Sequence, residues 1–244
     1  MRSVFIGSAV ACALASASYA ADMPIKAPQM VQTQAVSTWT GFYLGLHGGY
    51  AWGDSTATAV TGNANFPVGS TVSSGHPEGG LFGAQVGYNY QISQWLIGLE
   101  GDYSIADISS TESTTTAIGN TNTSSGKHKW LADVTGRLGY VVMPDLLLYF
   151  KGGWAWTHND ASSTLTSPAG VVLSTSTGSE DRDGFLVGGG VEYAFLPHWS
   201  AKLEYNYMDF GTTTVTRVSN TGTTSLRDSK LNLNVFKAGI NYRF

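Results

Sequence analysis

Ten ionisable residues that fall on the same side of alternating segments are the strongest candidates for chemistry in this sequence. They are five acids and five bases: Glu100, Asp102, Asp133, Glu192, Glu204, Arg137, Lys151, Lys202, Lys237 and Arg243. The neighbouring carboxylates Glu100 and Asp102 could serve general acid–base catalysis if one of them kept a proton near neutral pH. Ion pairing is favoured instead, because opposite charges are equal in number and an unpaired charge in a narrow interior costs several kcal/mol. We therefore predict a lumen ion-pair network and no catalytic residue.

The five histidines show no recognisable metal or nucleophile site. None has a metal-ligand spacing such as His-x-x-x-His, and the sequence has neither a Gly-x-Ser-x-Gly elbow nor a Gly-rich phosphate loop. His47 lies on a predicted strand, where a hydrogen-bonded structural role is expected. His76, His128 and His158 lie on separate predicted loops, so haem binding would require those loops to converge. We predict no cofactor, no metal and no enzymatic activity, with a haem-binding surface protein and a lipid A-modifying enzyme as minor alternatives.

The elements that position these residues are strands with one apolar and one polar side. In the segment 236–244 every second residue is apolar, and the residues between are Lys, Gly, Asn and Arg. The same alternation marks eight segments: 40–54, 80–91, 95–106, 129–142, 146–157, 183–195, 199–210 and 230–244. About eleven residues at about 3.3 Å each, tilted by about 40°, cross a hydrocarbon layer of roughly 25 Å. All seven Trp lie near predicted strand ends, as expected for side chains at a bilayer interface.

The connections between these segments alternate strictly in length. Residues 92–94, 143–145 and 196–198 predict short turns, whereas 55–79, 107–128, 158–182 and 211–229 are long and rich in Ser, Thr, Gly and Asn. Outer-membrane barrels have short periplasmic turns and long extracellular loops. We therefore predict an all-β fold, an eight-stranded antiparallel transmembrane β-barrel of this kind. Its interior would be just wide enough to be filled by side chains, so we expect the charged residues to close the lumen.

Composition argues against several other classes. Charged residues are 12% of the chain, against about 25% in soluble domains. No apolar run outside the N-terminus reaches the roughly 18 residues of a transmembrane helix. The acidic balance, with 17 acids and 13 bases, gives nucleic-acid binding no support. A soluble sandwich or a lipocalin-like barrel shares the alternation, but it would bury the apolar face and carry more surface charge.

The first 38 residues have the features of export segments. Arg2 precedes an apolar stretch, and the Ser-Tyr-Ala sequence at 18–20 fits a signal peptidase site, so 1–20 is predicted to be a cleaved signal peptide. Residues 21–38 are polar, contain two prolines and predict a periplasmic leader, which leaves 39–244 as the barrel. Cleavage would remove Cys12, the single cysteine, so disulfides are not expected. The predicted destination is the cell outer membrane.

Three stretches resemble the small outer-membrane β-barrel proteins of alphaproteobacteria, a group that includes porin-family and opacity-like surface antigens. The segment from Trp39 to Gly53 is similar to their first strand, and 21–28 is similar to their mature N-terminus. The closing Tyr242-Arg243-Phe244 matches the aromatic C-terminal signal that the barrel-assembly machinery recognises. The resemblance covers the whole predicted mature chain, strongly at its two ends and as strand patterning between them.

This resemblance implies a barrel related to the membrane domain of OmpA, with roles in envelope integrity and surface interaction and no enzymatic activity. The partners it implies are outer-membrane lipid, lipopolysaccharide and, through Tyr242 and Phe244, the assembly machinery. Some relatives are described as haem binders or porins, so the resemblance leaves solute passage open. We expect no peptidoglycan-binding domain after the last strand. The predicted function is structural, with a lumen plugged by ion pairs, and the alternative is a narrow porin-type channel; the loop ligand and the oligomeric state stay open.

Overall fold

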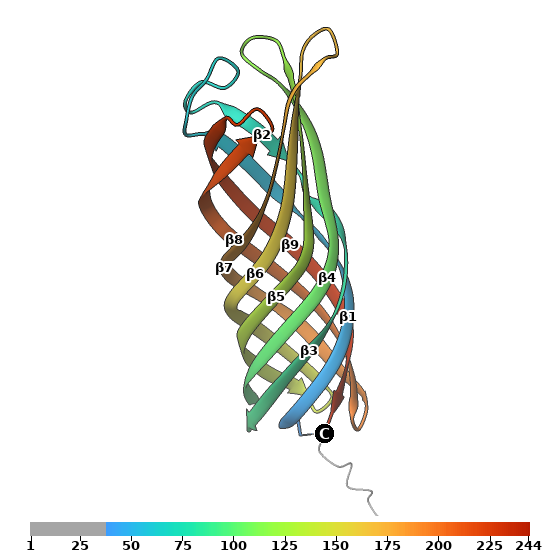
Figure 1. Cartoon of the computed structure of the whole chain (residues 1–244). Coiled ribbons are helices and arrows are strands. Elements are labelled where there is room, and N and C mark those ends of the chain that lie inside the picture. The colour runs from blue at the N-terminus through green and yellow to red at the C-terminus, as the bar shows by residue number, and fades with distance from the viewer. Residues whose placement is uncertain (1–37) are drawn as a thin grey trace, which may run out of the picture. The chain divides into compact units, whose positions relative to one another are not determined.

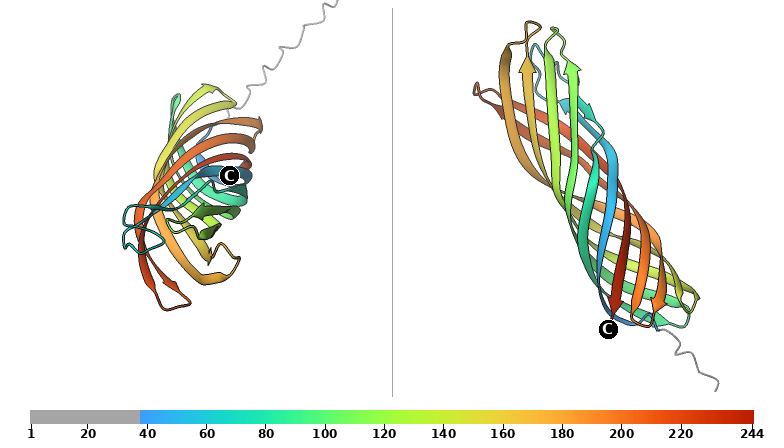
Figure 2. Two further views of the ribbon diagram at one scale, coloured as in Figure 1. Left: turned by 90° about the horizontal axis from the view of Figure 1, so that it is seen from above. Right: turned by 90° about the vertical axis from the view of Figure 1, so that its right-hand side faces the viewer.

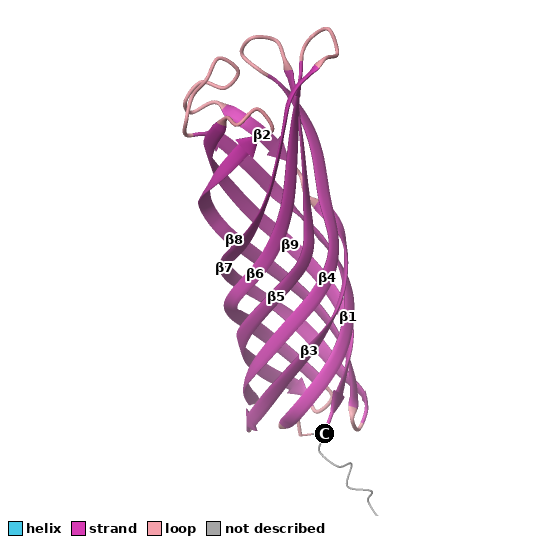
Figure 3. Cartoon of the chain, viewed as in Figure 1, coloured by secondary structure: helices cyan, strands magenta, loops and turns pink. Residues whose placement is uncertain are grey.

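The computed structural model describes residues 38–244, which form one antiparallel β-sheet closed into a barrel (Figure 1). Its strands, drawn in magenta in Figure 3, are β1 (Gly41–Ala59), β2 (Thr71–Gly75), β3 (Glu78–Ile92), β4 (Trp95–Thr115), β5 (Thr121–Met143), β6 (Leu146–Thr166), β7 (Val172–Leu196), β8 (Trp199–Ser219) and β9 (Thr224–Arg243). The described part of the chain contains no helix that is long and apolar enough to cross a membrane. The predicted signal peptide, 1–20, and residues 21–37 of the predicted leader lie outside the described residues.

The barrel closes because its first and last long strands pair with each other. β1 pairs with β9 from Tyr43 and Arg243 to Ala59 and Arg227, and with β3 along its other side. From β3 to β9 every strand pairs with the next in sequence, which completes the ring seen in Figure 2. Closure pairs the two edges that an open sheet would expose. The predicted all-β fold and its eight strands, here β1 and β3 to β9, are confirmed.

The short strand β2 is an addition to the eight strands that the alternation predicts. It lies within the first extracellular connection and pairs with β1 through Ser55 and Gly75, Thr56 and Ser74, and Ala57 and Ser73. The loop 60–70 precedes it, and the side chain of Phe66 from this loop packs with Ala59 and Val72. These residues are polar or small for the most part, so no apolar alternation marks the strand in the sequence.

The three other extracellular connections are long, as predicted, but most of their residues extend the strands beyond the membrane. Only 116–120, 167–171 and 220–223 remain as connecting segments. Hydroxyl side chains pair across these extensions, for example Thr111 Oγ1 and Ser125 Oγ at 3.2 Å and Ser113 Oγ and Thr123 Oγ1 at 3.0 Å. β-branched Thr favours strands, and cross-strand Ser/Thr hydrogen bonds stabilise them. The Ser/Thr-rich composition is therefore found here in solvated strands as well as in loops.

The side chains of the membrane-spanning region are arranged with the apolar side outward. Leu99 on β4 is 67% exposed, whereas its neighbour Glu100 is 1% exposed and points into the barrel. Exposed apolar side chains alternate with inward, buried ones along every long strand, so an apolar band surrounds an interior that contains the charged residues, the arrangement expected when lipid replaces water outside. The three predicted tight turns are confirmed as the connections from β3 to β4, from β5 to β6 and from β7 to β8.

Trp39 departs from the expected position at the membrane interface. Its side chain is fully buried at the end of the barrel where β1 begins, and the guanidinium of Arg243 lies 4.3 Å from the centre of its ring. Trp39 precedes β1, so it is free to turn inward, where a cation–π contact with Arg243 and apolar packing hold it. The other Trp side chains, such as Trp95 and Trp199, face outward.

One part of the wall lacks strand pairing. Ser176 and Thr177 of β7 pair with β8, and pairing resumes at Phe185 of β7, which lies opposite Asp209 of β8. Between these two stretches the ladder is interrupted. The interruption begins directly above the aromatic pair formed by Phe185 and Tyr207, whose ring centroids are 6.4 Å apart. It therefore lies above the apolar band, on the extracellular side.

Candidate functional site

All ten charged residues predicted to lie in the lumen point into the barrel, and each is at most 5% exposed. Salt bridges join nine of them into one network that spans the barrel from β4 and β5 through β6 to β7, β8 and β9. The tenth, Arg243, lies toward the periplasmic end, where its guanidinium donates to the carbonyl oxygens of Thr38 and Pro197. The structure thus brings the predicted residues together and supplies the pairings that the sequence leaves open.

Lys151 on β6 is the centre of this network. Its Nζ lies 2.9 Å from Glu100 Oε1 on β4 and 3.0 Å from Glu204 Oε1 on β8, and it is 3.6 Å from Asp133 Oδ1. Lys202 Nζ reaches the same two glutamates, at 3.6 Å from Glu100 Oε2 and 3.4 Å from Glu204 Oε2. Because β4 and β8 are not neighbours in the ring, these ion pairs cross the lumen rather than follow the wall.

Two tyrosines complete the periplasmic half of the network. Tyr43 donates a 2.8 Å hydrogen bond to Glu100 Oε2 and accepts one of 2.7 Å from Arg137 Nη1. Tyr149 donates to Glu204 Oε2 at 2.8 Å, and the Arg137 guanidinium stacks 3.9 Å from the centre of its ring. The other Arg137 nitrogen, Nη2, lies 2.9 Å from Glu192 Oε2. Neither tyrosine was predicted from the sequence to lie in the lumen, although both stand at inward positions of their strands.

The extracellular half of the network contains His47. Its Nε2 lies 2.9 Å from Ser104 Oγ, and its Nδ1 lies 3.5 Å from Asp102 Oδ2. Lys237 Nζ is 3.0 Å from Asp102 Oδ1 and 3.6 Å from Asp133 Oδ2. His47 faces the lumen as predicted, and its neighbours are hydrogen-bonding groups of the wall.

Apolar layers lie on both sides of the charged residues. Toward the periplasm, Trp39, Leu96, Val141, Leu147 and Tyr149 pack together. Toward the outside, a larger cluster fills the barrel: Ala51, Leu81, Ala106, Ile108, Leu131, Ala155, Leu186, Met208, Phe210, Leu231, Leu233 and Val235. Sequence reasoning missed this outer layer. The sequence carries one sign of it: Leu131 and Leu186 are apolar, yet they stand at positions that the alternation places inside the barrel.

These layers determine what the charged groups can do. Each carboxylate of the network lies within ion-pair distance of a cation, and the apolar layers separate the network from bulk water at both ends. Paired and desolvated charges in such a place hold one another in position and rigidify the interior when their hydrogen bonds are satisfied. Glu100 and Asp102 lie in this layer as ion-pair partners of Lys151 and Lys237.

The three histidines considered for haem do not share a site. His76 contacts Asp54 at 2.9 Å on the outer surface, whereas His128 is buried inside the barrel against Thr157. His158 lies on the outer surface, with its ring stacked 6.4 Å from that of Trp130. Within 38–244 no three His, Cys, Asp or Glu side chains are grouped as metal ligands would be.

The two histidines above the membrane band have opposite electrostatic environments. Burial, together with the charge of Arg182, lowers the pKa of His128 to about 4, so this ring is neutral at physiological pH. A hydrogen bond to Asp181 raises the pKa of His158.

Comparison with known proteins agrees with this architecture. The pattern of the outer membrane protein beta-barrel domain family matches residues 9–244. The chain belongs to this family. It is an outer-membrane β-barrel protein, and its localisation in the outer membrane follows from the family and from its relatives.

Two relatives show how far the likeness of this outer-membrane β-barrel protein extends. The 31 kDa outer-membrane immunogenic protein of Brucella melitensis biotype 1 is 30% identical over 257 residues and covers 100% of both chains. The 22 kDa outer membrane protein of Rhizobium leguminosarum bv. viciae is 32% identical over 214 residues, covering 86% of this chain and 82% of the relative. The predicted resemblance to alphaproteobacterial outer-membrane barrels and surface antigens is confirmed.

Solved structures support the fold of this outer-membrane β-barrel protein. OprG from Pseudomonas aeruginosa matches with a TM-score of 0.50 at 12% identity, covering 86% of this chain and 98% of OprG. The outer membrane protease OmpT from Escherichia coli matches with a TM-score of 0.54 at 10% identity, covering 86% of this chain and 100% of OmpT. At these identities the likeness concerns the barrel fold alone.

Proposed function

We propose that this outer-membrane β-barrel protein is a non-conducting structural protein that contributes to envelope integrity and presents its extracellular strands at the cell surface. The observation that carries this proposal is the charged layer that crosses the lumen between two apolar layers. An ion entering this interior would have to displace buried salt bridges and cross an apolar layer, and both steps are costly. The relatives are named as immunogenic outer-membrane proteins, which supports a surface-exposed role for the extended strands.

The purified barrel is expected to give no steady current in planar bilayers. The measurement is single-channel recording after insertion from detergent, with insertion verified by protease protection and by the shift in gel migration on boiling. Large, reproducible open-channel steps would reject the closed lumen and support the alternative, a narrow porin-type channel. A lipid A deacylation assay on the same preparation tests the proposal that the protein is not an enzyme, and product formation would overturn it.

We also propose that the C-terminal aromatic residues direct assembly and that lipopolysaccharide surrounds the barrel. Phe244 is 73% exposed at the end of β9, and its ring lies edge-on to Tyr242 at 5.2 Å. Such an outward aromatic pair is accessible to an assembly factor before insertion. Deletion of Phe244 is expected to reduce the amount of folded protein in cells while leaving refolding into detergent intact. Equal reduction in both settings would show that Phe244 serves stability alone.

A further inference from the structure

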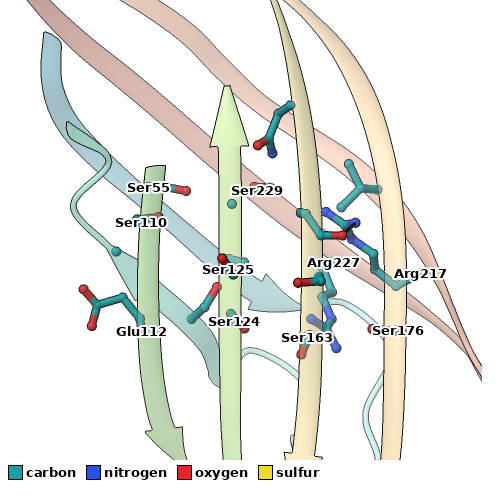
Figure 4. Close-up of a pocket in the computed structure, with 18 of the residues that line it drawn as sticks. Ser55, Ser110, Glu112, Ser124, Ser125, Ser163, Ser176, Arg217, Arg227 and Ser229 are labelled. Carbon is teal, nitrogen blue, oxygen red and sulfur yellow. Dashed lines mark hydrogen bonds between the residues drawn. The ribbon is translucent and has the colours of Figure 1, made fainter. Parts of the chain in front are cut away.

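A polar cavity lies inside the extracellular half of the barrel, above the outer apolar layer (Figure 4). Its volume is about 80 Å³, and nine of its nineteen lining residues are Ser. A buried water requires roughly 10–15 Å³, so the cavity has room for several waters or one small polar group. The hydroxyls that line it can both donate and accept hydrogen bonds. The cavity therefore has the volume and the hydrogen-bonding groups to hold a small polar molecule.

Two arginines enter this cavity from the same part of the wall. Arg217 on β8 and Arg227 on β9 stand on the inward face, where Val215 pairs with Arg227 and Arg217 pairs with Ser225. This register makes the two arginines diagonal neighbours, close enough for long side chains to converge. Figure 4 shows both side chains on one side of the cavity and Glu112 on the other.

Among the described residues Glu180 is the one carboxylate at ion-pair distance of either arginine, because Glu112 lies on the opposite side of the cavity. Glu180 Oε1 lies 2.9 Å from Arg182 Nη2 and 3.7 Å from Arg217 Nη2, so one carboxylate serves two guanidiniums. Within the described residues Arg227 has no carboxylate at ion-pair distance, and its guanidinium lies 5.9 Å from the centre of the Phe66 ring. Burial and the charge of Arg217 lower the pKa of Arg227 from its usual value. The arginine side of the cavity thus carries more positive than negative charge, because Arg182 and Arg217 share one carboxylate and Arg227 has none at ion-pair distance in the described part of the chain.

We propose that Arg217 and Arg227 bind a phosphoryl group in this cavity, either free phosphate or a phosphate carried on lipopolysaccharide. Guanidinium groups hold phosphate oxygens through paired, charge-assisted hydrogen bonds. A phosphate monoester carries about −1.5 to −2 charges at neutral pH, opposite in sign to the excess charge on the arginine side of the cavity. The serine hydroxyls supply further donors. This site shares no residue with the charged layer that crosses the lumen, and it goes beyond the structural function proposed above.

The interruption between β7 and β8 lies beside the two arginines, on the route by which a lipid-borne phosphate would come closest to them. The unpaired stretch begins above Phe185 and Tyr207, at the height where sugar and phosphate groups lie outside the apolar band. On the inside of the barrel, the side chain of Arg217 extends from β8 across the interruption to β7. Its Nη1 lies 2.5 Å from the position that a Cβ atom would occupy at Gly178 of β7. Its guanidinium also donates to the carbonyl oxygen of Ala161 on β6 at 3.3 Å. The absent side chain at Gly178 makes room for this arginine.

Calorimetric titration with inorganic phosphate tests the site in the refolded full chain, at constant ionic strength and in detergent without phosphate. The wild type is expected to show saturable binding. R217Q and R227Q are each expected to weaken it at least about tenfold, the effect of losing a hydrogen bond to a charged group. K230Q is the matched control, because it removes a positive charge from the outward face of β9 and should leave affinity within about twofold. Each variant is first shown to be folded by its migration on gels with and without boiling.

Repeating the titration with lipopolysaccharide present separates the two sources of phosphate. If phosphorylated lipopolysaccharide abolishes the binding of inorganic phosphate and dephosphorylated lipopolysaccharide does not, the site binds the phosphate of the lipid. If neither form changes the binding of inorganic phosphate, the site binds free phosphate. Absence of saturable binding by the wild type, or equal affinities of R227Q and K230Q, would overturn the proposal. None of these readings depends on conductance, so the site and the closed lumen stand or fall independently.

Discussion

Replacing Lys151 with Met is expected to lower the free energy of unfolding by about 3–5 kcal/mol, the cost of removing one partner from a buried ion pair. Lys151 Nζ contacts Glu100, Glu204 and Asp133, and Met would fill most of its volume without neutralising any of them. The cations that remain near two of these carboxylates are more distant: Lys202 Nζ lies 3.4 Å from Glu204, and Arg137 Nη1 and Lys202 Nζ lie 3.5 Å and 3.6 Å from Glu100. Guanidinium unfolding in lipid vesicles, followed by Trp fluorescence, measures the change.

Two further variants distinguish loss of charge balance from loss of packing. K230Q, which removes a charge from the outer surface, is expected to change stability by less than about 0.5 kcal/mol. In the K151M background, D133N should restore part of the loss, because it removes a carboxylate while Lys237 keeps Asp102 at 3.0 Å. If the effects of K151M and D133N simply add, the charges are not coupled and the network is not what stabilises the interior.

The sequence predicted the wall of the barrel well because lipid imposes one requirement on every strand. Each outward side chain between the aromatic girdles must be apolar, so residues such as Leu99 and Phe150 mark both the strand and its face. The inward face of Glu100 and Lys151 follows from the same phase. The alternation does not predict which charges form pairs. It gives the face on which a residue lies, but the position of the residue along the barrel axis also depends on how the strands are staggered. Lys151 pairs across the lumen with β4 and β8, a contact that strand phase alone leaves undetermined.

The features that sequence reasoning missed lie where this requirement is absent. Above the membrane the outward face of β4 to β9 meets water instead of lipid, so hydrophobic alternation disappears and strand residues such as Thr111 resemble loop residues. Inside the barrel, the outer apolar layer and the inward Trp39 are shaped by neighbours from other strands. Tyr43 and Tyr149 carry the inward phase, yet an aromatic residue in such a strand is equally typical of the membrane interface. The register of the whole ring was needed to place them against Glu100 and Glu204.

The fit of Tyr43 inside the barrel makes Gly87 on β3 sensitive to a single methyl group. A Cβ at Gly87 would stand 2.3 Å from the Tyr43 hydroxyl oxygen and 2.7 Å from the carbonyl oxygen of Leu99. Tyr43 cannot move freely, because its hydroxyl is hydrogen-bonded to both Glu100 and Arg137. The carbonyl of Leu99 cannot move freely either, because it is part of the strand backbone that forms the barrel wall. Overpacking of this kind costs about 1–3 kcal/mol, so G87A is expected to destabilise the barrel by that amount.

Gly101 supplies the matched control for this substitution, because it lies at the same height on the neighbouring strand and faces outward. It stands one residue from Glu100, the pairing partner of Gly87, and a Cβ there would meet no atom within 4 Å. G101A is therefore expected to leave the free energy of unfolding within about 0.5 kcal/mol of the wild type. Unfolding of both variants in vesicles under identical conditions gives the comparison. Equal stabilities of G87A and G101A would mean that Tyr43 yields without cost, and that the bonds joining it to Glu100 and Arg137 do not hold the interior rigid.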